Sequence, residues 1–139
     1  MDRSTSDTSR PIRIALADDS DESRGRLAWR LRQYADRVRV VRFDDGAVDL
    51  VLVDPYPDGR GFDADVFGPG LVPDLPIVIY TPSEEIDQLA FGLAAAVVGS
   101  RRLRGWISAG LTAADLVGCL ELAHDGTIVL HSRAGAISA

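Results

Sequence analysis

Short apolar runs, each followed by polar or turn-forming residues, recur along the chain. The most continuous is VDLVLVD at residues 48–54, and a segment rich in Pro and Gly follows it. An apolar run of this length without helical spacing is typical of a strand buried on both faces of a parallel sheet. Similar runs predict four further strands, at residues 12–17, 38–43, 76–80 and 105–108.

Helical spacing of apolar residues separates several of these runs. Leu27, Leu31 and Tyr34 follow the first strand, and either Ser20 or Asp21 is suited to cap the helix that they predict. A last helix is expected to open at Thr112 and to end by Gly126. Its predicted buried face comprises Leu116, Leu120 and Ala123.

The segment after the fourth strand predicts another helix. Residues 81–84, Thr-Pro-Ser-Glu, match a capping box with Pro at the first helical position, so we expect the helix to begin there. Gly99 is a plausible end. The predicted buried face comprises Ile86, Leu89, Ala90, Leu93 and Val97.

The link between the second and third strands is short. Only residues 44–47 separate them, which is too few for the helix that usually joins parallel strands. Either an extended link crosses the face of the sheet, or Asp45 and Gly46 turn a hairpin and the second strand is antiparallel. We favour the extended link. Strands alternating with helices predict an α/β fold, a doubly wound parallel sheet with helices on both faces.

Composition restricts the class of protein. The 139 residues, 46% of them hydrophobic, fit a single globular domain at residues 11–139 behind a polar, disordered leader at residues 1–10. A single cysteine, Cys119, excludes a disulfide framework, and no apolar run reaches the length of a membrane span. We therefore expect a cytoplasmic protein. The net charge of −6 argues against direct binding of nucleic acid or membrane, and allows a cation or a basic protein partner.

Polar residues end three of the predicted strands. Asp18 and Asp19 follow the first strand, Asp54 ends the third, and Thr81 follows the fourth. Ligands of doubly wound sheets bind outside the carboxyl ends of the strands, so we expect these groups to converge. Three carboxylates in one pocket repel one another unless a cation joins them, and hard oxygen ligands suit Mg²⁺. Beside such a metal, Asp54 is a candidate nucleophile toward a phosphoryl group, and the Thr81 hydroxyl is a candidate hydrogen-bond donor to it.

Each of these residues also has a simpler interpretation. An Asp before Pro often hydrogen-bonds its own backbone in a turn, as Asp54 before Pro55 is placed to do. Thr81 is suited to cap a helix, and Asp18 and Asp19 favour the positive end of the helix that follows them. Acids on two strands together with Thr81 favour the pocket.

The order and spacing of these residues resemble the receiver domain of two-component response regulators, over roughly residues 12–130. The resemblance rests on ADDS at residues 17–20, on Asp54 at the end of its strand, on Thr81, and on residues 104–130. It implies a flavodoxin-like sheet of five parallel strands in order 2-1-3-4-5, with the second helix absent or vestigial. It also implies site roles: Asp54 as phosphoacceptor, Asp19 as direct metal ligand, Asp18 as ligand through water, the Tyr56 carbonyl as backbone ligand, and Thr81 and Trp106 as switch residues.

One departure from the family pattern concerns a lysine. The family's lysine is expected at Ala109, and the final third of the chain contains none. The chain is thus similar to an atypical receiver, the regulatory part of a transcriptional regulator, with a histidine kinase or other signalling protein as partner and a homodimer as a possible state. The alternative is a phosphorylation-independent pseudo-receiver that acts as a dimerisation or protein-interaction module.

Enzymatic alternatives find less support in the sequence. Haloacid-dehalogenase-type phosphatases need a second Asp two residues after the nucleophile, and Tyr56 occupies that position here. No Gly-rich phosphate loop follows the first strand. We therefore expect no enzymatic activity.

Overall fold

The computed structural model describes most of the chain. Nearly all of the expected leader lies outside the described residues, as do Asp19, Ser83 and Glu84. Only the backbone is described for residue 132 and for residues 135–138. The described residues are 10–18, 20–56, 63, 66, 75–82, 85–99, 101–132 and 135–138.

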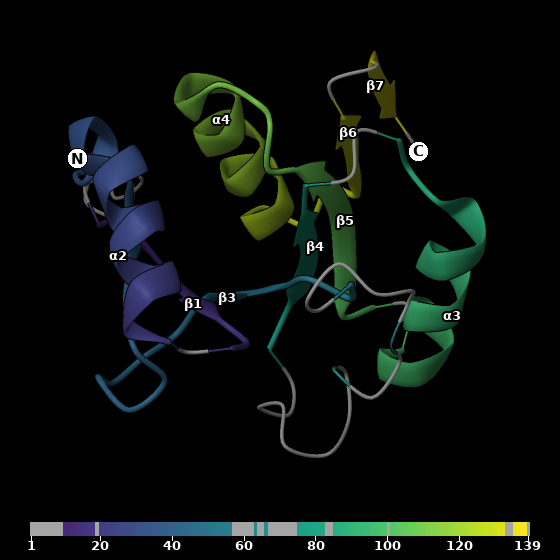
Figure 1. Ribbon diagram of the computed structural model, residues 1–139, viewed down its shortest axis with the longest axis horizontal. Coiled ribbons are helices and arrows are strands. Elements are labelled where there is room, and N and C mark those ends of the chain that lie inside the picture. The colour runs from purple at the N-terminus through teal and green to yellow at the C-terminus, as the bar shows by residue number, and fades with distance from the viewer. Residues whose placement is uncertain are drawn as a thin grey trace, which may run out of the picture.

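One sheet carries the strands of the described chain, in the order β2-β1-β3-β4-β5-β6-β7 (Figure 1). The first six strands are parallel to their neighbours, and β7 is antiparallel to β6. The predicted doubly wound sheet with order 2-1-3-4-5 is confirmed, but two strands extend it beyond the expected five. The strands are β1 Ile12–Leu16, β2 Val38–Val40, β3 Leu50–Val53, β4 Ile77–Thr81, β5 Leu103–Ser108, β6 Val129–Ser132 and β7 Gly135–Ser138.

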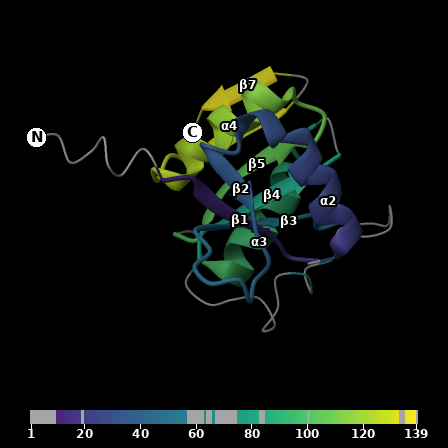
Figure 2. The same ribbon diagram turned by 90° about the vertical axis from the view of Figure 1, so that its left-hand side faces the viewer.

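Helices cover both faces of the sheet. Helices α2 (Asp21–Arg30) and α4 (Ala113–His124) lie on one face, and α3 (Gln88–Val98) lies on the other (Figures 1 and 2). Each face has its own apolar core. On the first face Leu27, Leu116 and Leu120 are buried as the periodicity predicted, and Thr112 caps α4 through the Asp115 N–H. A 3₁₀ turn, Arg32–Tyr34, follows α2.

The link between β2 and β3 crosses the sheet without a helix. Both strands pair in parallel with β1, which lies between them, so the extended link is confirmed and the hairpin is excluded. Phe43 and Val48 of this link pack against the core on the α3 face. The link therefore covers apolar surface that a crossover helix would otherwise cover. It also includes residues 41–43, which the sequence had assigned to the second strand.

The start of α3 differs from the prediction. Asp87 caps this helix, accepting a hydrogen bond from the Ala90 N–H at 3.1 Å, and the helix begins at Gln88. Thr81 is instead the last residue of β4 and pairs with Ser108 of β5. The predicted capping box at Thr81 is therefore wrong, because β4 extends through this residue and the helix starts seven residues later.

The buried face of α3 also differs from the predicted one. Leu89, Leu93 and Val97 are 74%, 46% and 51% exposed, while the buried residues are Ala90, Ala94 and Val98. Apolar side chains occur on every side of α3, so how well each side fits against the sheet decides which residues are buried. The small side chains allow the helix to approach the sheet closely, and of the predicted face only Ala90 is fully buried.

Strands β6 and β7 extend the sheet after α4. Strand β6 pairs with β5, and its Val129 and Leu130 are buried in the cores of opposite faces. A Cβ on Gly105 would overlap the carbonyl oxygen of Val129 and lie 3.1 Å from its carbonyl carbon, so the two strands meet at a glycine. Within the described residues, the helices are all too short or too polar to cross a bilayer.

Candidate functional site

The carboxyl ends of β1, β3 and β4 lie along one edge of the sheet. Asp18 stands in the turn after β1, and Asp54 directly follows β3. These two acids line the same cavity, about 890 Å³ in volume, which Pro82 and Ala109 also line. The structure therefore brings together two of the predicted acids and the position expected for lysine. Asp19 lies outside the described residues.

Asp54 is exposed at the end of a fully buried strand. Its Oδ1 accepts a hydrogen bond from the backbone N–H of Tyr56 at 3.0 Å, the turn geometry that Asp before Pro favours. This bond engages one of the two carboxylate oxygens. The turn interpretation of Asp54 is thus correct, and it is compatible with a carboxylate that lines the cavity.

Asp18 is tied to the first turn of α2. Its Oδ2 accepts a hydrogen bond from the Ser23 hydroxyl at 2.8 Å. The Ser23 N–H in turn donates to the Ser20 side chain at 3.1 Å, which makes Ser20 the N-cap of α2. Helix capping and the position of Asp18 therefore depend on the same few residues.

Thr81 lies deeper than the two acids. It is 1% exposed, and it is not among the described residues that line the cavity. Its backbone carbonyl accepts from the Ala109 N–H at 2.7 Å, which joins the end of β4 to the loop after β5. Its partner in the sheet, Ser108, is fully buried and accepts from the Gly110 N–H through its hydroxyl. Ser108 was not singled out from the sequence.

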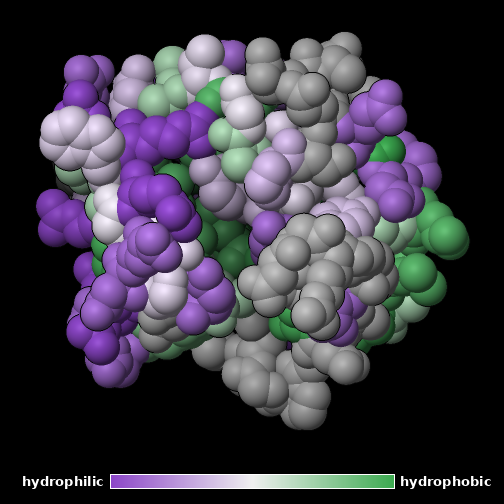
Figure 3. All heavy atoms as spheres, viewed as in Figure 1, coloured by the Kyte–Doolittle hydropathy of each residue, from purple (hydrophilic) through white to green (hydrophobic). Residues whose placement is uncertain are grey.

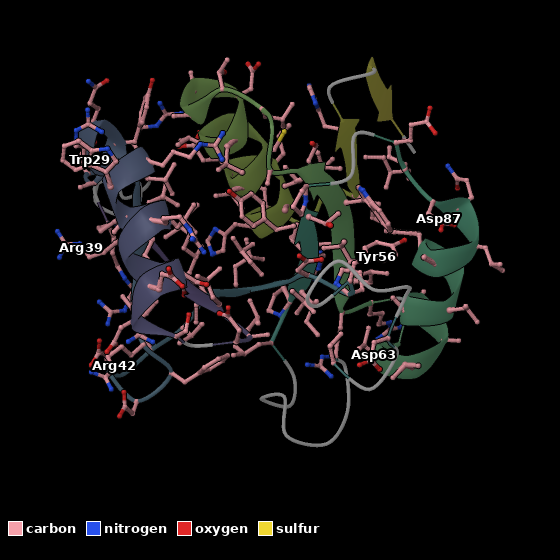
Figure 4. All side chains as sticks on the ribbon, viewed as in Figure 1. Trp29, Arg39, Arg42, Tyr56, Asp63 and Asp87 are labelled. Atoms are coloured by element: carbon pink, nitrogen blue, oxygen red, sulfur yellow. The ribbon has the colours of Figure 1, made fainter. Side chains whose placement is uncertain are left out.

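Tyr56 connects the turn at Asp54 to the opposite face of the sheet. Its hydroxyl donates to Asp87 Oδ2 at 3.2 Å, and Figure 4 shows the two side chains pointing toward one another. Burial and the neighbouring Asp87 carboxylate raise the pKa of the Tyr56 phenol to about 12. The sequence had assigned only the backbone carbonyl of Tyr56 to the site, so this side-chain contact was missed.

Trp106 lies against the ring of Tyr56. The two ring centroids are 6.2 Å apart and the planes are inclined at 64°, an edge-to-face contact. Trp106 is fully buried, and its indole Nε1 has no hydrogen-bond partner among the described residues. The residue assigned to the switch position is therefore held inside the core on the α3 face.

The cavity continues from the acids along α2. Its apolar wall includes Leu16, Leu27 and Leu52, and Figure 3 shows a hollow with apolar residues at its floor beside polar side chains. Arg30 of α2 spans this space, donating to the Tyr80 hydroxyl at 2.8 Å and to the Leu111 carbonyl. Burial raises the pKa of Tyr80, and Arg30 acts in the opposite direction.

The oxygen atoms at this site are of the type that binds a hard cation. Asp18 and Asp54 are carboxylates on one cavity, which is the ligand type that Mg²⁺ prefers. Within the described part of the chain, no three His, Cys, Asp or Glu side chains form a metal-binding group. The predicted third carboxylate, Asp19, is outside that part.

Comparison with known proteins identifies the fold. No family model and no curated protein matches the chain. The signal receiver domain of an HD domain-containing protein from Pseudomonas fluorescens Pf-5 has a TM-score of 0.54 at 19% identity, over 85% of this chain and 89% of that one. A response regulator receiver protein from Pseudoalteromonas atlantica has a TM-score of 0.51 at 13% identity, over 82% and 98%.

A third solved structure is longer than this chain. The response regulator ChrA of a heme-sensing two-component system has a TM-score of 0.51 at 18% identity, and the match covers 84% of this chain and 58% of ChrA. Identities this low show the fold alone. Sheet order and helix placement define a doubly wound, flavodoxin-like α/β domain. Within that class, the chain has the fold of a response-regulator receiver domain.

Proposed function

We propose that this chain is an atypical receiver domain in two-component signalling, with Asp54 as its phosphoacceptor. The observation that carries the proposal is that Asp18 and Asp54, from neighbouring parallel strands, line one cavity at the carboxyl edge of the sheet. The receiver fold of the solved structures supports the same function. The domain would be the cytoplasmic regulatory part of a transcriptional regulator and would receive the phosphoryl group from a histidine kinase.

The proposed chemistry is a phosphoryl transfer to a carboxylate. An Asp54 oxygen attacks the phosphorus of the donor, the bond from phosphorus to the donor's leaving group breaks, and an acyl phosphate forms. The geometry after β3 suits this role, because Oδ1 is fixed by the Tyr56 N–H while the carboxylate remains exposed. Mg²⁺, held by Asp18, Asp19, Asp54 and the Tyr56 carbonyl, would offset charge on the transferred oxygens. We propose no enzymatic activity toward an external substrate.

Incubation with Mg²⁺ and acetyl phosphate tests this proposal. Intact-mass measurement should detect one added phosphoryl group on the wild type and none on Asp54→Asn. Asp36→Asn is the matched control, because Asp36 is an exposed acid in the turn before β2. A phosphoryl group on Asp54→Asn, or none on the wild type under conditions that modify a standard receiver, would refute the assignment.

A second candidate function is a phosphorylation-independent interaction module. It is favoured by the exposed apolar side chains of Leu89, Leu93 and Val97, which recur every fourth residue on α3. It is also favoured by Ala109 at the position expected for the family's lysine, in a chain that contains no lysine. The module would dimerise or bind another signalling protein through α3.

Sedimentation velocity of the unphosphorylated chain tests the second candidate. Concentration-dependent self-association that Leu93→Glu abolishes would support it. Arg101→Glu, an exposed change outside α3, is the control for added negative charge. A monomer at all concentrations, with no partner retained by the wild-type α3 surface, would count against it.

A further inference from the structure

The cavity beside Asp54 is larger than a phosphoryl site requires. Its volume is about 890 Å³, and small-molecule sites in proteins span roughly 300–1,000 Å³. A magnesium ion and one phosphoryl group would occupy only its acidic end. Residues of α2 also line the cavity, and most of the lining side chains of the cavity as a whole are apolar. Space of this size is sufficient for a small organic molecule.

Two aromatic residues, Tyr80 and Trp29, line the cavity. Tyr80 is half-buried on β4, and its hydroxyl is held by Arg30. Trp29 also lines the cavity yet is 68% exposed, and the Arg32 guanidinium lies over its ring at 3.8 Å from the centroid. A large exposed indole fixed at the rim of an apolar cavity is suited to contact a bound molecule.

Two arginines of α2 contribute cationic groups to the lining of the cavity. Arg26 lies one helical turn before Arg30 on α2, and both line the cavity. Arg30 is occupied by Tyr80 and Leu111, whereas Arg26 has an exposed ion pair with Glu22 at 3.8 Å. Such an exposed pair is weak, so the Arg26 guanidinium remains able to bind an anion. The net charge of the chain is −6, so the positive charge of Arg26 is opposite in sign to the charge of the chain as a whole.

We propose that this cavity binds a small organic anion with a flat apolar body, its charge contacted by Arg26 and its body by Trp29 and Tyr80. Charge complementarity favours contact of an anion with the arginines of α2, because Arg26 and Arg30 are the cations among the described residues that line the cavity, and Asp18 and Asp54 are its acids. Guanidinium binds carboxylate and sulfonate oxygens through several donors. The proposal goes beyond phosphorylation, since the contacts to Arg26, Trp29 and Tyr80 do not involve the Asp54 acyl phosphate.

Two probes that differ only in charge test the proposal. 8-Anilino-1-naphthalenesulfonate is an anion with an apolar aromatic body that includes a flat naphthalene ring, and N-phenyl-1-naphthylamine has the same aromatic body without the sulfonate. Fluorescence titration, checked by calorimetry, should show saturable binding of the sulfonate at one site per chain. Arg26→Gln should weaken the sulfonate about fivefold and leave the neutral probe unchanged. Arg39→Gln is the matched control, because Arg39 is exposed on β2 and points away from the body of the molecule (Figure 4).

Further variants locate the site. Trp29→Ala should remove the proposed aromatic contact and reduce binding of both probes, with its thermal melting temperature showing that the chain folds. Asp54→Asn should retain binding of the probes. A failure of phosphorylation therefore does not refute ligand binding, and a failure of ligand binding does not refute phosphorylation. Equal weakening by Arg26→Gln and Arg39→Gln would overturn the proposed contact. Wild-type affinity in folded Trp29→Ala, or no saturable binding by the wild type, would overturn the site.

Discussion

Replacing Gly105 with alanine tests the most unexpected part of the fold, the docking of β6 on β5. The added Cβ would overlap the carbonyl oxygen of Val129 and lie 3.2 Å from its nitrogen. All of these atoms are backbone, so a rotation of one side chain does not relieve the overlap. The two strands must separate, and β6 then loses its ladder contacts with Gly105, Trp106 and Ile107.

The expected cost follows from what β6 buries. Val129 and Leu130 are each 8% exposed, and full burial of such a side chain contributes about 1.5–3 kcal/mol. Partial retention of these contacts, and a compact unfolded state, reduce the sum, so we expect Gly105→Ala to lower the free energy of unfolding by about 3 kcal/mol. Urea denaturation measures this loss. Amide hydrogen exchange should rise first in residues 129–132.

Gly118→Ala is the matched control for this substitution. A Cβ on Gly118 of α4 has no atom within 4 Å, and alanine is favoured over glycine in a helix by about 1 kcal/mol. The same chemical change should therefore stabilise one site and destabilise the other. If Gly105→Ala stays within about 0.5 kcal/mol of the wild type, β6 does not lie against Gly105 and the seven-stranded sheet is refuted.

Three further predictions concern single side chains. Burial raises the pKa of Cys119 to about 11, so iodoacetamide at neutral pH should modify this thiol only after denaturation; rapid labelling of the native chain would contradict its burial. The Tyr56 pKa is raised from 10.0 to about 12, so its contribution to stability is complete below pH 10 and is lost as the pH rises through about 12. Tyr56→Phe should remove one late-ionising phenol from an absorbance titration, and an unchanged titration would refute the assignment. Beryllofluoride on Asp54, a mimic of the phosphoryl group, should change dimerisation little in the wild type and more in Ala109→Lys, where an ammonium would adjoin the phosphoryl oxygens. A large wild-type response that Asp54→Asn abolishes would contradict this last expectation.

The parts of the fold that the sequence predicted are those whose local pattern of apolar and polar residues indicates one kind of element. Strand β3 is buried on both faces and reads as a continuous apolar run, and α2 and α4 place Leu27, Leu116 and Leu120 on one side with polar residues opposite. The strand order then follows from the right-handed crossover rule. Where the pattern is decisive locally, the prediction was correct.

The errors occur where tertiary fit decides. Helix α3 is apolar on every side, so periodicity did not reveal that Ala94 and Val98 would be buried while Leu89 is exposed. Strand β6 is four residues long, and its pairing depends on a glycine that lies more than twenty residues earlier. Neither signal is present in the local sequence.

The candidate site was likewise predicted only in part. Acids at the ends of β1 and β3 were predicted because strand ends can be identified from the apolar runs. A pocket at the acids was predicted, but its extension along α2 was not, because that part depends on the distance that Arg30 spans between α2, Tyr80 and the loop at Leu111. The side-chain contacts of Tyr56 were missed because Asp87 lies thirty-one residues away in the chain.

The contacts of Tyr56 provide a connection between Asp54 and β5 in a chain that lacks the family's lysine. The backbone of Tyr56 donates to Asp54, its ring contacts Trp106 of β5, and its hydroxyl donates to the N-cap residue of α3. Tyr56 thus connects the proposed phosphoacceptor Asp54 to Trp106 of β5, a proposed switch residue, without a lysine. Phosphorylation would change the charge of the Asp54 carboxylate, whose Oδ1 accepts the Tyr56 N–H, and so would act first on this contact. The beryllofluoride experiment therefore separates two cases: a small wild-type response means that packing through Tyr56 does not replace a charged contact to β5, and a large one means that it does.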